Sequence, residues 1–227
     1  MNNINIQNFE SIISFFFKSQ IIEQGYKIYD KTTLFGRIMN TDLFQYINFQ
    51  KPRKGINRLE VDFGIEFLFK KKAESIKKYI SPDLGHRFTY FNSGVSTDYV
   101  YRNESELLFG VINISRIMNS AVFKWLDNHV SSASLFDAFN DRALRKPDYQ
   151  WAEISLAYLH LRFGDKNKSF EIAQKIIREN PIHESKILIC NELLSHSNDS
   201  ETEIEQYLNG IVKENIKALK LNSFLKS

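Results

Sequence analysis

The sequence is poor in cysteine, proline and glycine. Cys190 is the only cysteine among 227 residues, so no disulfide can form within the chain. Four prolines and nine glycines argue against a loop-rich or disordered chain. Because Cys190 lies in the apolar run 186–194, we expect a small buried residue and not a nucleophile.

Long apolar runs are also missing. Uninterrupted apolar stretches such as Phe15–Phe17 are far too short to cross a bilayer. Residues 1–5 contain none of the basic residues that begin a signal peptide. Together with the single cysteine, these features favour a cytoplasmic protein that has no membrane partner.

Catalytic and cofactor motifs are absent from the sequence as well. It contains no glycine-rich phosphate loop and no Gly-x-Ser-x-Gly string, and none of its five histidines is spaced for a zinc site. The tripeptide Asp62-Phe63-Gly64 matches the metal-binding motif of protein kinases, but it lies inside an alternating strand, which indicates a chance match. His160 lies on an apolar helix face, where we expect a packing residue with its hydrogen bonds satisfied. We therefore expect no cofactor, no metal and no enzyme activity.

What the sequence does have is a large aromatic core and clear periodicity. Hydrophobic residues make up 43% of the chain and aromatic residues 14%. The stretch 58–69 alternates apolar and polar residues, which predicts an antiparallel strand with one packed face and one solvated face. Glu60, Asp62 and Glu66 fall on the solvated face, where paired carboxylates would otherwise suggest catalysis or metal binding.

The order of the periodic segments predicts an α+β fold. A helix ending at Gly25 precedes strands at 33–39 and 44–50, which are joined by a turn at 40–42. A long apolar stripe at helical spacing follows over 104–129. We expect residues 1–146 to form a domain with an antiparallel sheet of about four to five strands packed against helices.

From residue 147 to 227 only helical patterns appear, which predicts an all-α helical-hairpin domain. Ser200 and Glu203 form a capping box for the last helix, and Asn209-Gly210 is expected to break it. The charge supports two regions, because residues 1–147 hold 20 Lys/Arg and 15 Asp/Glu, whereas residues 148–227 hold 10 and 12.

The segment 150–181 resembles a single tetratricopeptide repeat. Leu156, Ala157, Gly164 and Pro181 stand where that motif has leucine, a small residue, glycine and proline. Three other motif positions differ, and no second copy of these residues follows at the expected offset. A plain helical hairpin is the alternative, and both imply antiparallel helices packed through apolar faces.

Residues 7–145 resemble the domain of unknown function 4304 family of bacterial proteins. The resemblance rests on the order of segments: 44–51, then 62–65, then 85–88, then a long helix that reaches Trp125-Leu126. It implies an α+β fold and a bacterial origin, without an established enzyme activity. A link to toxin–immunity loci is a further implication.

Candidate binding residues gather near a predicted hairpin loop at 51–55. The basic residues are Lys51, Arg53, Lys54 and Arg58. Solvated loop charge is the simplest explanation of this cluster. Together with nearby aromatics it also suits single-stranded nucleic acid or an acidic protein, and lysines at 70–72 and 77–78 add charge. His86 and Arg87 follow a glycine turn and are candidates for binding an anionic group, although bracing the sheet is the alternative.

These observations favour a non-enzymatic protein-interaction protein that binds a protein partner, with toxin neutralisation as one such role. Two alternatives remain open. One is a nucleic-acid-binding module that uses the basic hairpin, and the other is an enzyme with a site built from distant residues, including His86 and the Asp62 face. The sequence leaves the oligomeric state open.

Overall fold

The computed structural model describes residues 6–30, 33–50, 58–87, 99–145, 150–179 and 182–225. The chain divides into two compact units. The first comprises Met1–Ile38, Gln45–Ile65 and Gly85–Asn128, and the second comprises Met39–Phe44, Glu66–Leu84 and His129–Ser227. The boundary predicted between residues 146 and 147 lies outside the described residues.

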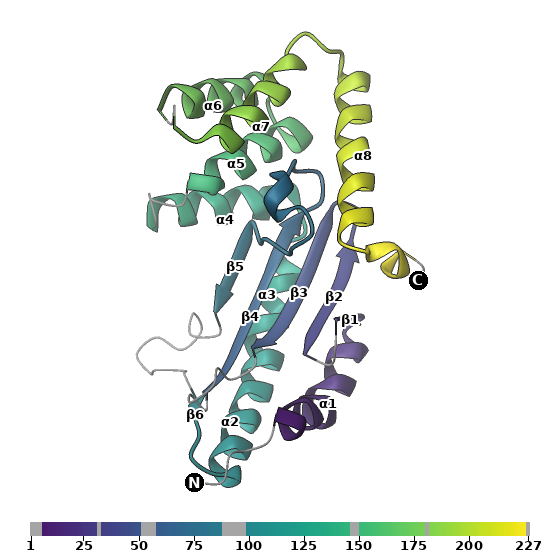
Figure 1. Cartoon of the computed structure of the whole chain (residues 1–227), viewed down its shortest axis with the longest axis vertical. Coiled ribbons are helices and arrows are strands. Elements are labelled where there is room, and N and C mark those ends of the chain that lie inside the picture. Colours follow the sequence, from purple (N-terminus) through teal and green to yellow (C-terminus); the bar gives the residue numbers. More distant parts are fainter. Residues whose placement is uncertain are drawn as a thin grey trace. The chain divides into compact units, whose positions relative to one another are not determined.

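The predicted α+β fold with an antiparallel sheet is confirmed. The main path of the sheet follows the chain order and consists of β1 (Lys27–Asp30), β2 (Leu34–Met39), β3 (Leu43–Gln50), β4 (Arg58–Phe67) and β5 (Leu84–Arg87). A short strand, β6 (Tyr99–Val100), pairs with β4 away from this path (Figure 1). The sequence did not predict β1, because four residues are too few to show a period of two.

The predicted turn between β2 and β3 is confirmed. Asn40 and Thr41 have φ values of 51° and 61°, in the left-handed region. Asparagine adopts this conformation readily, whereas it is unusual for the β-branched threonine. The amide of Leu68 donates to the carbonyl of Asp42 over 2.8 Å, which fixes the backbone just after the turn.

Strand β4 is more deeply buried than its alternation predicts. Leu59, Val61, Phe63 and Ile65 are buried as expected. On the other face, however, Glu66 is 0% exposed, so the prediction that this carboxylate is solvated is wrong. The reason is a buried ion pair between Glu66 and Lys72, which offsets part of the cost of removing this carboxylate from water.

The N-terminal helix α1 (Ile6–Glu23) packs on the sheet within the first unit. Its buried residues are spaced four apart: Phe9, Ile13, Phe17 and Ile21. The rings of Phe17 and Phe49 lie 4.7 Å apart between centroids. Gly25 follows the helix with φ +80°, so the predicted left-handed end is confirmed.

A long helical stretch follows β6 in the same unit. It consists of α2 (Glu104–Ile117), a π-helical turn (Met118–Val122) and α3 (Phe123–Asn128). The predicted apolar stripe is buried, including Leu107, Val111, Ile114 and Leu126. Figure 1 shows α3 behind the strands, and the rings of Phe63 and Trp125 lie 5.3 Å apart.

By length and composition alone this stretch is also sufficient to cross a membrane. The 24 residues Ser105–Asn128 have a mean hydropathy of 1.2 over their most apolar window, and 39% of that window is buried. Core helices of soluble proteins share this property. Because the apolar residues recur at helical spacing and face the interior, the stretch fits a core helix.

The second unit is mainly helical. It contains α4 (Ser132–Arg145), α5 (Gln150–Phe163), α6 (Lys166–Glu179), α7 (Glu184–Ser195) and α8 (Glu201–Ala218). Each of α4 to α6 packs on the helix that follows it, and α8 packs on α5. The capping box of Ser200 and Glu203 is confirmed, but α8 continues through Gly210, so the predicted break is wrong. A single glycine costs a helix only about 1 kcal/mol.

The helix starts in this unit recur at a nearly constant interval. Helices α5 and α7 begin at residues 150 and 184, and α4 and α6 begin at 132 and 166, so both intervals are 34 residues. Helix α8 begins at 201, which is 35 residues after α6. This is the period of tetratricopeptide repeats, although the motif residues themselves do not recur.

Candidate functional site

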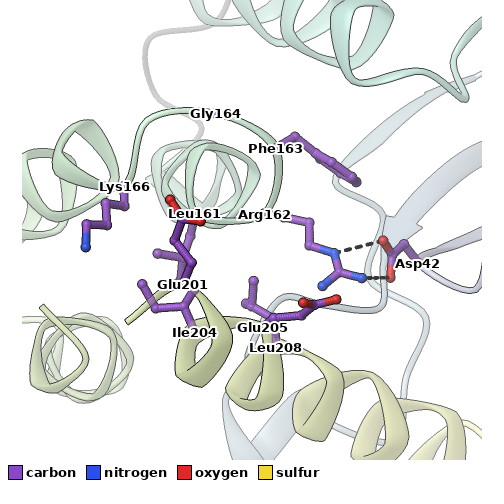
Figure 2. Close-up of a pocket in the computed structure, with 10 residues that line it drawn as sticks. All are labelled: Asp42, Leu161, Arg162, Phe163, Gly164, Lys166, Glu201, Ile204, Glu205 and Leu208. Carbon is purple, nitrogen blue, oxygen red and sulfur yellow. Dashed lines mark hydrogen bonds and ion pairs between the residues drawn. The ribbon is translucent and has the colours of Figure 1, made fainter. Parts of the chain in front are cut away.

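A cavity of about 470 Å³ opens in the second unit (Figure 2). Its lining comes from the end of α5, the α5–α6 turn, the first half of α8 and Asp42 in the β2–β3 turn. The volume lies in the range of natural ligand pockets, roughly 300–1,000 Å³.

One side of the cavity is braced by an ion pair between Arg162 and Asp42. The Nε and one terminal nitrogen of Arg162 donate to the two carboxylate oxygens of Asp42, over 3.0 and 3.1 Å. The side chain of Asp42 is 8% exposed and that of Arg162 is 16% exposed. A bidentate contact of this kind fixes the guanidinium plane and neutralises its charge.

The apolar part of the cavity is formed by α5 and α8. Leu161, Ile204 and Leu208 contribute side chains that are at most 7% exposed. Phe163 is 41% exposed and meets the ring of Phe69 edge-on, with 5.5 Å between centroids. The three aliphatic side chains are therefore almost covered, and the apolar surface that a ligand could meet comes mainly from Phe163.

The α5–α6 turn is tight because a glycine occupies it. A Cβ added at Gly164 would lie 3.0 Å from Nδ1 of His160 and 3.2 Å from the ring of Phe136. The His160 and Phe136 rings pack against each other, with centroids 4.7 Å apart. Nδ1 of His160 is buried without a hydrogen-bond partner among the described residues, so the prediction of a fully satisfied histidine is wrong. Burial lowers the pKa of His160, and nearby Lys168 lowers it further.

Helix α8 contributes two carboxylates to the cavity. Glu201 lies in its first turn and Glu205 lies four residues later, so both project from the same side of the helix. Both are exposed, and neither has a hydrogen-bond or ion-pair partner within the part of the chain that the structure describes. The one lysine of the lining, Lys166, donates to the carbonyl of Asp199 over 3.4 Å.

Two buried ion pairs fix the chain that follows β4 in the same unit. Lys70 pairs with Asp83, which also accepts from the hydroxyl of Ser155. Lys72 pairs with Glu66, and Lys72 also donates to the carbonyl of Tyr79 over 2.7 Å. The prediction that these lysines add to a solvated basic surface is wrong, because Lys70 is 6% and Lys72 only 4% exposed.

Burial makes the Glu66 carboxyl a weaker acid than an exposed glutamate. Removal from water raises the pKa of Glu66 from 4.5 to about 7, and the opposing attraction of Lys72 offsets only part of this effect. The amide of Ser81 donates to the Glu66 carboxylate over 3.0 Å. Cys190 is buried as predicted, and burial raises its pKa to about 11, so its thiol is unreactive at neutral pH.

The residues predicted from the sequence to bind a ligand stay predictions. Lys51, Arg53 and Lys54 lie outside the described residues. Arg58 begins β4, where it is paired with Val100 of β6. His86 and Arg87 end β5, and the structure describes only their place in that strand. Asp62 accepts a hydrogen bond from the side chain of Gln50.

The cavity residues themselves were not predicted. Asp42 was assigned only to a turn, and Arg162 lies 120 residues further along the chain, so no local pattern joins them. Glu201 and Glu205 looked like ordinary solvated helix residues. The only available signal was that both lie on the helix face that also carries Ile204 and Leu208.

No group of three or more histidine, cysteine, aspartate or glutamate side chains gathers as for a metal ion within the described ranges. Comparisons of the chain with protein-family models, with curated proteins and with solved structures gave no match.

Proposed function

We propose that this chain is a non-enzymatic protein-interaction protein and that the cavity of its helical unit receives part of a partner protein. The observation that carries the proposal is a cavity whose lining combines the partly exposed ring of Phe163 with two carboxylates that have no partner among the described residues. Protein interfaces combine a buried apolar centre with polar groups that the partner completes.

The helix arrangement supports the same function. Helix pairs that recur every 34 residues form the extended surfaces through which repeat proteins bind other proteins. In this unit the cavity lies beside the turn that joins α5 and α6, at the end of that helical hairpin. The hairpin is held in place by the Arg162–Asp42 pair.

A role in toxin neutralisation in bacteria is the specific form of this proposal that the resemblance to the domain of unknown function 4304 family implies, and the composition of the chain favours a cytoplasmic location. Nucleic-acid binding through the basic residues of the predicted loop at 51–55 is the weaker alternative, because Lys70 and Lys72 are internal and do not add to an exposed basic surface. No observation favours an active site at His86 or Asp62.

The test is retention of a partner by the immobilised full chain, from an extract of the cells that encode it. The variant Glu205→Lys reverses a cavity charge, and Glu171→Lys reverses an exposed charge on α6 as a control with the same net charge. We expect one discrete protein to be retained by the wild type and by the control, and to be lost with Glu205→Lys. The retained protein, once purified, should bind at a fixed stoichiometry. No retained protein, or equal retention by all three chains, would contradict the proposal.

A further inference from the structure

The outer side of helices α1 and α2 in the first unit is apolar. Phe15 on α1 is 81% exposed, and Phe109 and Ile112 on α2 are 66% and 46% exposed. Each ring is two residues away from buried residues on both sides in its own helix, so it points away from the core. The helices lie side by side, because the hydroxyl of Ser115 donates to the side chain of Gln20 over 3.0 Å. At roughly 150–250 Å² per aromatic side chain, the two rings alone leave about 200–350 Å² in water, which is typical of an interaction site.

Two opposite charges flank the apolar residues of α2. Glu106 lies one turn before Phe109, and Arg116 lies one turn after Ile112. Both charged side chains are exposed. Glu106 accepts from the amide of Arg102 over 2.8 Å, whereas Arg116 has no ion-pair partner in the part of the chain that the structure describes. The exposed stripe of α2 thus begins with an acidic residue, continues through an apolar centre and ends with a basic residue.

This order of residues is complementary to itself when the helix direction is reversed. Glu106 and Arg116 each lie five residues from position 111, so each is about 7.5 Å from that point along the helix axis. A two-fold axis at position 111 would relate two antiparallel α2 helices and bring Glu106 of each copy level with Arg116 of the other. Phe109 of each copy would then lie level with residues 112–113 of the other, so the apolar centres cover each other.

Other occupants match this stripe less well. A partner whose charge is of one sign would be repelled at one end of the stripe. A membrane surface would cover the apolar centre, but anionic lipids would repel Glu106. A second copy of the chain satisfies the acidic end, the apolar centre and the basic end together.

We infer that this chain forms a symmetric dimer through antiparallel α2 helices, with a contact between Glu106 and Arg116 at each end of an apolar centre of Phe109 and Ile112. Phe15 on the neighbouring helix extends the apolar surface. The inference concerns the first unit and is independent of the function proposed for the cavity.

Sedimentation equilibrium of the full chain measures the association. Because the apolar surface is small, we expect a reversible monomer–dimer equilibrium within about 1–500 µM. The variant Phe109→Ser should raise the dissociation constant at least about 10-fold. Since the ring of Phe109 is mostly exposed in the single chain, the circular dichroism spectrum of this variant should match that of the wild type.

Charge reversals test the antiparallel register. In Arg116→Glu chains each contact joins two acidic residues, and in Glu106→Lys chains it joins two basic residues, so each variant alone should dimerise at least about 10-fold more weakly. An equimolar mixture of the two variants restores both contacts and should associate about as tightly as the wild type. Asn103 accepts from the backbone amide of residue 106 and therefore still caps α2 in Glu106→Lys. The control Lys124→Glu makes the same charge change at an exposed site outside the contact and should dimerise like the wild type.

Three results would overturn the inference. They are a wild-type chain that is still monomeric at about 500 µM, a dimer that Phe109→Ser leaves unchanged, and a mixture of the two charge variants that associates no more tightly than either variant alone. A monomeric chain that binds phosphatidylcholine vesicles, and loses this binding with Phe109→Ser, would also overturn it and would assign the apolar face to a membrane.

Discussion

Arg162 contacts both carboxylate oxygens of Asp42, over 3.0 and 3.1 Å, although the two residues are 120 positions apart in the chain. Removing one member of a largely buried pair leaves the other charge without compensation. We expect Asp42→Ala and Arg162→Ala each to lower the free energy of unfolding by about 3 kcal/mol. The double variant should lose much less than the sum, because no isolated charge remains. Urea titrations of all four chains measure this coupling, and strictly additive losses would show that the pair contributes nothing.

Gly164 and Gly210 should respond to alanine in opposite directions. At Gly164 the new methyl group would press on His160 and Phe136, which pack against each other and cannot both yield. We expect a loss of about 1–2 kcal/mol there. At Gly210 nothing lies within 4 Å, and alanine in a helix interior should add about 0.5–1 kcal/mol. Thermal unfolding of the two variants tests both expectations. A Gly164→Ala chain that is as stable as the wild type or more stable would contradict the tight turn.

The buried Glu66 predicts a particular pH dependence. Its folded-state pKa of about 7 exceeds the unfolded value of 4.5, so its contribution is greatest below pH 4.5 and is lost as pH rises toward 7. Relative to Glu66→Gln, the wild type should therefore lose up to about 3 kcal/mol over this interval. Urea unfolding at pH 4 to 8 measures the difference. A gap between the two chains that stays constant with pH would mean that Glu66 is not buried as described.

The capping box of α8 positions the cavity glutamates. The hydroxyl of Ser200 accepts from the amide of Glu203, and the Glu203 side chain accepts from the amide of Ser200. We expect Ser200→Ala to cost about 1 kcal/mol and to increase hydrogen exchange in the first turn of α8, where Glu201 lies. Ser197→Ala, in the preceding exposed turn, is the control. Unchanged exchange at residues 201–204 would argue that the cap does not hold this turn.

Local patterns were sufficient for most elements but not for their burial. The spacing of Phe9, Ile13 and Phe17 predicted α1, and the alternation after Arg58 predicted β4, because both depend on near neighbours in the chain. The same alternation misplaced Glu66, since a charge is buried only when a partner compensates it, and Lys72 lies six residues further on, beyond the end of β4. The alternation within the strand does not reveal that partner.

The candidate site was beyond sequence reasoning for a related reason. It joins a turn residue, Asp42, to the end of α5 and to one face of α8, and only the fold brings these segments together. The recurrence of helix starts every 34 residues was hidden as well, because the helices keep the period while the motif residues do not. Helix ends carry weaker signals than helix interiors.

The most direct measurement is photo-crosslinking of the full chain in the native cell extract. Benzoylphenylalanine is placed at position 166, which lines the cavity and leaves Glu201 and Glu205 in place, or, as a control, at position 171. The predicted result is an adduct of one discrete mass at position 166 only. Equal labelling at both positions, or no adduct at position 166, would contradict a partner-binding cavity beside α8.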